Sequence, residues 1–183
     1  MPTWAWILIA AGVLVAVAAV GYAALRARRR KQLQESFGPE YDRAVSEAPT
    51  RREAETELLE RRKRHDELEL RELSPAARDG YARQWEATQA RFVDDPQSAI
   101  NDADDLIQQV MRERGYPVED FDRRAADLSV EHGDVIEHYR AGHAIARRNV
   151  HGDADTEELR QALVHYRALF EALLAGEPAE ARQ

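Results

Sequence analysis

The chain has 183 residues, a formal net charge of −8 and no cysteine. The lack of thiols excludes disulfide frameworks, thiolate metal sites and cysteine nucleophiles. Five of the 26 basic residues lie at 26–31, which leaves 21 against 34 acidic residues in the rest of the chain. Nucleic-acid backbones require concentrated positive charge, so we expect no nucleic-acid partner. About 150 residues remain for one domain with a single core.

Residues 1–25 contain no charged side chain, whereas five of the next six residues are basic. The apolar run exceeds the roughly 20 residues that an α-helix needs to cross the hydrocarbon core of a bilayer. We therefore predict a transmembrane anchor at 1–25 and a basic juxtamembrane segment at 26–36. Aromatic and basic residues typical of membrane interfaces flank the run: Trp4, Trp6, Tyr22, Arg26, Arg28, Arg29, Arg30 and Lys31.

The position of the positive charge predicts the orientation of the anchor. Lysine and arginine beside a spanning helix stay on the cytoplasmic side, so we expect a single-pass inner-membrane protein with its N-terminus outside and its domain in the cytoplasm. The alternative is a cleaved secretory signal, which would make the remainder an exported helical protein. Signal peptides carry positive charge before a shorter apolar region, so we favour the anchor, with the lipid bilayer as partner. Gly12 and Ala16 leave self-association of the anchor into a homo-oligomer open.

Segment 37–72 is predicted to contain a hinge and a long charged helix. Gly38-Pro39 should end the anchor helix and begin a short new one. From Arg51 to Leu70 there is no proline or glycine, and a seam recurs at steps of four and three: Ala54, Leu58, Arg61, His65 and Leu68. Two seam positions are polar, so this helix is expected to pack loosely, as a coiled coil or against the domain. An exposed charged helix is the alternative.

Segment 73–175 is predicted to be a bundle of four or five helices. An N-cap followed by proline begins a helix at Ser74-Pro75 and another at Asp95-Pro96. Gly115 should end the second helix. The two helices are expected to form an antiparallel pair.

Three further helices are expected after residue 120. Apolar spacing indicates a short helix near Phe121 to Leu128 and a longer one from Gly133 to Asn149. A capping-box spacing begins the last helix at Asp155, and its apolar stripe is Leu159, Leu163, Tyr166, Phe170 and Leu173. No segment has strand periodicity, so the predicted fold class is all-α. Residues 176–183 are predicted to be a disordered tail.

The six histidines fit no metal-binding or catalytic spacing. None has a glutamate three residues before it, as the Glu-x-x-His pattern of di-iron bundles requires, and the acidic clusters lack calcium-loop spacing. We therefore expect no catalytic residue, metal site or cofactor. The alternative is a histidine- and carboxylate-dependent enzyme in the bundle, with His138, His143 and His165 as candidates.

The function predicted from the sequence is a membrane-tethered interaction module, an adaptor or scaffold that binds another protein. The charged helix is expected to carry the contact surface, because its weak seam contributes little to a core and its leucines lie beside basic residues. The expected surface residues are Leu58, Leu59, Arg61, Arg62, Lys63, Arg64, Leu68 and Leu70.

Short strings carry a resemblance to a known family: Phe37 to Arg43, Leu73-Ser74-Pro75, Arg91 to Pro96, Arg114 to Pro117 and His165-Tyr166-Arg167. Through them the chain resembles an actinobacterial-type family of single-pass, membrane-anchored helical proteins. The resemblance covers nearly the whole chain and implies the same location and helical fold. Members of that family are mostly uncharacterised, so the resemblance implies no activity.

Overall fold

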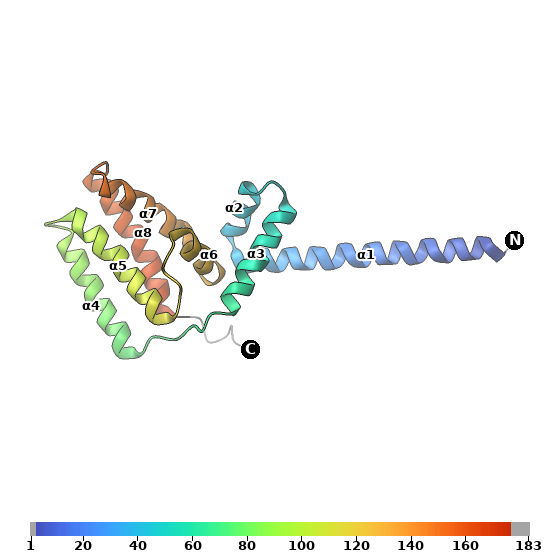
Figure 1. Ribbon diagram of the computed structural model, residues 1–183, viewed down its shortest axis with the longest axis horizontal. Coiled ribbons are helices and arrows are strands. Elements are labelled where there is room, and N and C mark those ends of the chain that lie inside the picture. Colours follow the sequence, from blue (N-terminus) through green and yellow to red (C-terminus); the bar gives the residue numbers. More distant parts are fainter. Residues whose placement is uncertain (1–2, 177–183) are drawn as a thin grey trace.

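The computed structural model describes the backbone of residues 3–176 and the side chains of residues 12–176. This part of the chain contains eight α-helices and no strand, which confirms the all-α fold class. Figure 1 shows one long helix projecting from a body formed by the other seven. The side chains of Trp4 and Trp6, and residues 177–183 of the predicted tail, lie outside the described residues.

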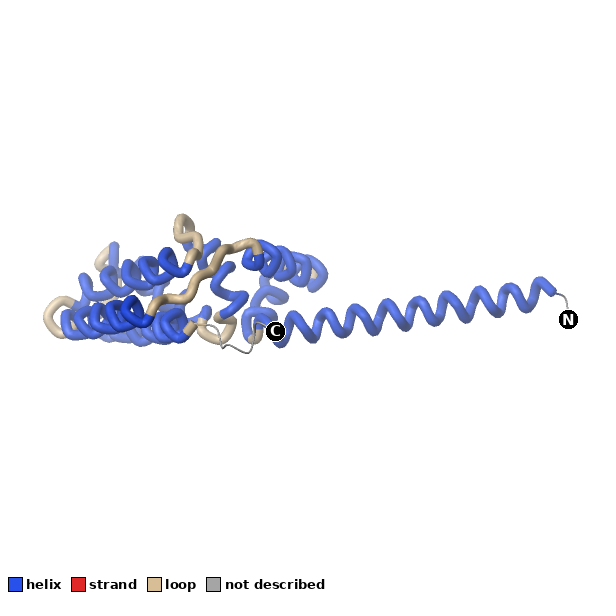
Figure 2. The backbone as a smooth tube through the Cα atoms, turned by 90° about the horizontal axis from the view of Figure 1, so that it is seen from below, coloured by secondary structure: helices blue, strands red, loops and turns tan. Residues whose placement is uncertain are grey.

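The projecting helix, α1 (Thr3–Phe37), runs without a break through the apolar run and its basic flank. Figures 1 and 2 show from two directions that its N-terminal part stands clear of the other helices. Its large apolar side chains there are 58% to 72% exposed: Val13, Leu14, Val15, Val17, Val20, Tyr22 and Leu25. Among the described residues, no helix combines the length and the apolar character needed to cross a membrane.

The next two helices, α2 (Pro39–Glu47) and α3 (Arg51–Asp66), fold back onto the C-terminal end of α1. Their buried apolar side chains form a small core of their own: Leu33, Phe37, Tyr41, Ala44, Ala54 and Leu58. We call residues 33–66 the neck. The predicted break at Gly38-Pro39 is confirmed, because Gly38 has a φ of 50° and α2 begins at the proline. Gly38 and Pro39 themselves are exposed, whereas Phe37 before the break and Tyr41 after it are buried in the neck core.

The predicted charged helix is shorter than its sequence pattern indicated. The pattern ran to Leu70, whereas α3 ends at Asp66; a turn follows at 67–68, and residues 69–74 cross to the bundle without regular secondary structure. The backbone N–H of Arg71 donates to the carbonyl oxygen of Arg114 at 2.8 Å. This hydrogen bond ties the segment to the end of another helix, so a long-range contact overrides the local helical pattern.

Five helices form the bundle: α4 (Pro75–Arg91), α5 (Pro96–Arg114), α6 (Phe121–Glu131), α7 (Ile136–Val150) and α8 (Thr156–Ala175). The predicted number of four or five is confirmed. The side chains of Ser74 and Asp95 accept the expected N-cap hydrogen bonds, and Asp155 forms its capping box with Glu158. Gly115 ends α5 in the left-handed conformation. Predicted and observed helices differ by a few residues at their ends, as at α7.

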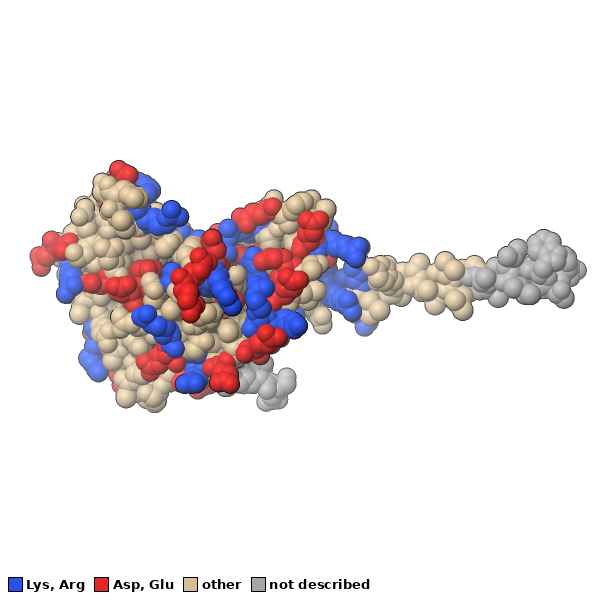
Figure 3. All heavy atoms as spheres, viewed as in Figure 1, with Lys and Arg blue, Asp and Glu red and all other residues tan. Residues whose placement is uncertain are grey.

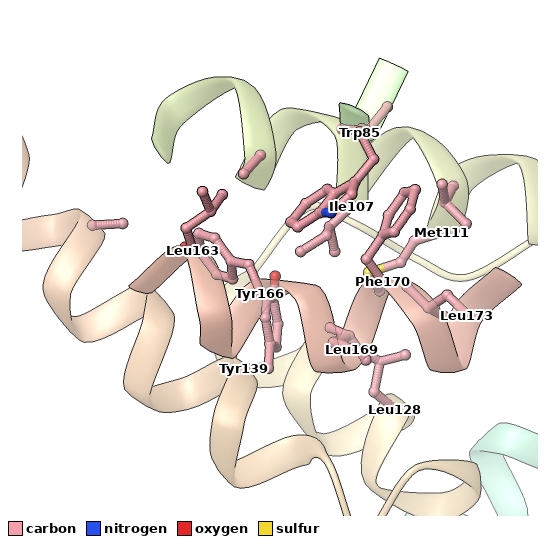
Figure 4. Packing of buried hydrophobic residues seen from close by; sticks show 14 of the residues in the cluster. Trp85, Ile107, Met111, Leu128, Tyr139, Leu163, Tyr166, Leu169, Phe170 and Leu173 are labelled. Carbon is pink, nitrogen blue, oxygen red and sulfur yellow. The ribbon is translucent and has the colours of Figure 1, made fainter. Parts of the chain in front are cut away.

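The bundle core surrounds α8, which packs against α5 and α7. All five residues of the predicted α8 stripe are buried. Figure 4 shows Phe170 of α8 beside Trp85 of α4, with ring centroids 4.6 Å apart in a stacked arrangement. Tyr166 faces Tyr139 of α7, at a centroid distance of 6.1 Å. The bundle therefore has its own core, separate from that of the neck.

Neck and bundle meet where the end of α1 touches the turn after α6. A Cβ atom added to Gly133 would lie 2.6 Å from the backbone oxygen of Phe37. Such an approach is closer than a side-chain carbon tolerates, so only glycine fits there without displacement. This contact and the packing of α3 on α6 hold the neck directly on the bundle.

Candidate interaction site between neck and bundle

The seam of α3 faces the protein interior. Ala54, Leu58 and His65 are buried, so α3 lies against the domain, and the alternative of an exposed charged helix is wrong. Leu58, predicted as a contact residue, is fully buried in the neck core. Arg61 is turned inward and its side chain is only 14% exposed. The structure therefore removes Leu58 and Arg61 from the predicted contact surface.

The other predicted surface residues differ in exposure. Leu59, Lys63 and Arg64 are exposed. Arg62 is half-buried, with its guanidinium 5.8 Å from the centre of the Phe37 ring. The two remaining leucines, Leu68 and Leu70, are half-buried against the bundle core. An accessible surface of this helix thus remains, but it is smaller and more basic than predicted.

A buried carboxylate connects three helices at the junction. The Glu40 side chain of α2 is 1% exposed and accepts hydrogen bonds from Arg61 of α3 at 2.7 Å and from Arg140 of α7 at 2.5 and 2.9 Å. Burial by itself raises the pKa of Glu40, but the bonds and positive charges of Arg140 and Arg61 outweigh it and lower the pKa. Glu40 is therefore ionised at neutral pH and fixes the neck to the bundle.

A second carboxylate with little exposure, Glu131, lies at the end of α6, and its side chain is 9% exposed. Its Oε1 is 3.3 Å from Nε2 of His65, and its Oε2 accepts the hydroxyl hydrogen bond of Tyr116. The Nη2 of Arg114 and Nε2 of His132 lie 3.6 and 3.8 Å from Oε2. Burial opposes ionisation, but the bonds from His65 and Tyr116 prevail and lower the pKa of Glu131 to about 2. A group so firmly ionised cannot serve as a general acid near pH 7.

A cleft of about 500 Å³ opens beside Glu131. It is lined by the C-terminal ends of four helices, at Ser36 of α1, Asp66 of α3, His132 after α6 and Ala172 of α8. The C-terminal end of a helix carries about half a negative charge. Three carboxylates and one guanidinium also line the cleft, so its electrostatics favour a cationic group. Burial lowers the pKa of His132, which keeps this imidazole neutral at pH 7.

The candidate histidines of the enzyme hypothesis only partly converge. His138 and His165 approach to 2.9 Å between their Nδ1 atoms, whereas His143 stacks on Phe121 with ring centroids 3.7 Å apart. Partial burial and the nearby His138 lower the pKa of His165. Within residues 12–176, no group of three or more His, Asp or Glu side chains is arranged to hold a metal. Among the described residues, the converging pair therefore has no third side chain placed to share a metal ion with it.

Comparisons with protein-family models, curated proteins and solved structures returned no match to this chain. The family resemblance drawn from the short strings therefore stays a prediction. Sequence reasoning missed Glu40 and Glu131, because a single glutamate in a charged chain carries no signal of burial. The only available hint was the pair of polar positions, Arg61 and His65, on the inward seam of α3.

Proposed function

We propose that this protein is a membrane-tethered interaction module, in which α1 enters the bilayer and the neck and bundle bind another protein in the cytoplasm. One observation carries the proposal. The described apolar side chains from Val13 to Leu25 are exposed on a helix that stands away from the body, and five basic residues follow immediately. The uncharged run at 1–25, of which only residues 12–25 have described side chains, is long enough in sequence to enter the bilayer. The basic residues that follow it favour the cytoplasmic side for the domain.

The neck supports this role by fixing the bundle to the anchor. The helix continues unbroken from Leu25 to Phe37, a rise of about 18 Å at about 1.5 Å per residue, and its end is buried in the neck core. Glu40 then joins the neck to α7 through Arg140. The proposed module therefore presents its binding face at a set distance from the membrane.

The cleft beside Glu131 is the proposed docking point. The helix C-terminal ends and the carboxylates of Asp66 and Asp134 attract a positively charged side chain. A protein segment that inserts a lysine or arginine into the cleft fits this chemistry. The proposed partner of the cleft is therefore a basic segment of a cytoplasmic protein.

Site-specific photo-crosslinking in cells tests the docking point. A photoreactive residue in place of Ala175, which lines the cleft, is expected to give one discrete crosslinked product. The same residue in place of Ala144, exposed on α7, should give none. Asp66→Lys with Asp134→Lys should abolish the product. Equal crosslinking from both positions, or a product that survives the double charge reversal, contradicts the proposed docking point.

Alkaline carbonate extraction tests the anchor. The native chain should stay in the membrane pellet, whereas Leu14→Lys with Val15→Lys should release it, because each charge near the centre of a span opposes insertion by about 3 kcal/mol. The matched variant with alanine at both positions is the control and should stay in the pellet. Release of the native chain would contradict membrane insertion.

A further inference from the structure

A groove of about 250 Å³ lies between α1 and α3 on the outer side of the neck. Arg26 and Arg29 of α1 line one wall and Arg52 of α3 lines the other. The apolar side chains of Leu25 and Leu59 lie in the same groove. Figure 3 shows basic side chains gathered where α1 enters the body. The groove therefore combines an apolar surface with three guanidinium groups at the base of the projecting helix.

The positive charge of the groove is only partly offset by the protein, because three arginines and one glutamate line it. Among residues 12–176, none of the three arginines forms an ion pair with a carboxylate. The one acidic residue in the lining, Glu55, accepts a hydrogen bond from the hydroxyl of Tyr41 at 3.0 Å. By contrast, Lys31 outside the groove lies 3.6 Å from Glu35. The arginines of the groove are thus available to an external anion.

We propose that the groove binds the phosphate-bearing headgroup of an anionic phospholipid from the membrane that α1 enters. This inference rests on the proposed function, because it places the groove at the cytoplasmic surface of the bilayer. Guanidinium groups bind phosphate oxygens through paired hydrogen bonds. Leu25 and Tyr22, toward the membrane end of the groove, meet the glycerol and acyl part of the same lipid.

The proposal also accounts for Leu59. It is the one large apolar side chain of α3 that is strongly exposed, at 44%, and it faces the groove with Arg52. A lipid bound there contacts both α1 and α3. Binding is therefore stoichiometric and saturable, unlike the diffuse attraction of a basic segment to any anionic surface.

The test uses the full chain in neutral detergent micelles, titrated with phosphatidylglycerol and analysed by native mass spectrometry. Arg29→Gln with Arg52→Gln removes two charges from the groove. The control, Arg28→Gln with Arg51→Gln, removes two charges from the same helices one position away, at residues that do not line the groove. The native chain and the control should each retain one lipid, and the groove variant should need at least tenfold more lipid for the same occupancy.

Several outcomes would overturn the proposal. Equal weakening of lipid binding in the two double variants would mean that the basic residues attract anionic lipid without a specific site. Retention of phosphatidylcholine to the same extent as phosphatidylglycerol would mean that the headgroup charge is not recognised. Displacement of the lipid by an equal concentration of inorganic phosphate would assign the groove to a soluble anion. Carbonate extraction separates the two proposals: release of the native chain contradicts the anchor, whereas normal retention without lipid discrimination contradicts the groove alone.

Discussion

Replacing Glu40 with glutamine should weaken the attachment of the neck to the bundle. The carboxylate is 1% exposed and accepts three hydrogen bonds from the guanidinium groups of Arg61 and Arg140. Glutamine keeps the shape of the side chain but loses the negative charge. Its amide group also directs a donor toward two groups that can only donate. Arg61 and Arg140 then keep only the half-exposed carboxylates of Glu57 and Glu137 as ion-pair partners.

The expected cost follows from the exposure of the partners. Breaking a buried ion pair by removing one partner costs about 3–5 kcal/mol. The side chains of Arg61 and Arg140 are 14% and 17% exposed, so water restores part of their solvation. We expect Glu40→Gln to lower the free energy of unfolding by about 2–4 kcal/mol.

Glu47→Gln is the matched control on the same helix. Glu47 is 60% exposed and lies 2.9 Å from Arg43, and such surface pairs contribute about 0–1 kcal/mol. Urea unfolding of the full chain in detergent, followed by circular dichroism at pH 7, measures both variants. The Glu40 variant should also melt about 5–15 °C lower than the native chain. A cost within about 1 kcal/mol of the control would refute the role assigned to the Glu40 cluster.

Three further predictions test other parts of the structure. Gly133→Ala places a Cβ 2.6 Å from the backbone oxygen of Phe37, so thermal unfolding should show a loss of about 1–3 kcal/mol; an unchanged midpoint would contradict the close packing. The pKa of Glu131 is lowered to about 2, so its ionised form adds stability above about pH 4.5 that is lost as the pH falls toward 2. In urea titrations, Glu131→Gln should therefore lower the free energy of unfolding by about 3 kcal/mol at pH 7 and by almost nothing at pH 2. A loss of the same size at both pH values would contradict the stabilising role of the ionised Glu131 carboxylate. His138 and His165 lack a third ligand among the described residues, so elemental analysis should find zinc and iron well below one atom per chain; stoichiometric metal lost in His165→Ala would restore the enzyme hypothesis.

Local signals predicted most of the bundle. The capping box at Asp155 and Glu158 and the N-caps at Ser74 and Asp95 act within one helical turn, so their sequence spacing is sufficient to place helix starts. The buried face of α8 could also be predicted, because a helix buried along one face repeats its apolar residues every three or four positions.

The packing of the neck could not be predicted from local sequence patterns. Arg61 and His65 made the α3 seam appear weak, since polar residues on an inward face normally argue against burial. Their partners are the carboxylates of Glu40 and Glu131, and Glu40 lies 100 residues from its other partner, Arg140. Pairings over such separations leave no periodic pattern. Leu58 is buried by apolar contacts of α3 with α1 and α2 in the neck core, and the spacing within α3 does not indicate which helix it packs against.

The cleft beside Glu131 could not be predicted from the sequence either. It exists because four helices that are far apart along the chain end at one place. Each helix end was predicted within a few residues, except that of α3, but nothing in the ends themselves indicates that they converge. The convergence follows from how the neck packs on the bundle at Gly133.

Cysteine labelling in intact cells determines on which side of the membrane the domain lies, because the native chain has no cysteine that would react. Single variants Thr3→Cys and Asp153→Cys place thiols at opposite ends of the proposed topology. A membrane-impermeant maleimide should label Thr3→Cys in intact cells and Asp153→Cys only after permeabilisation. Labelling of Asp153→Cys alone in intact cells would place the domain outside the cytoplasm and contradict the proposed topology.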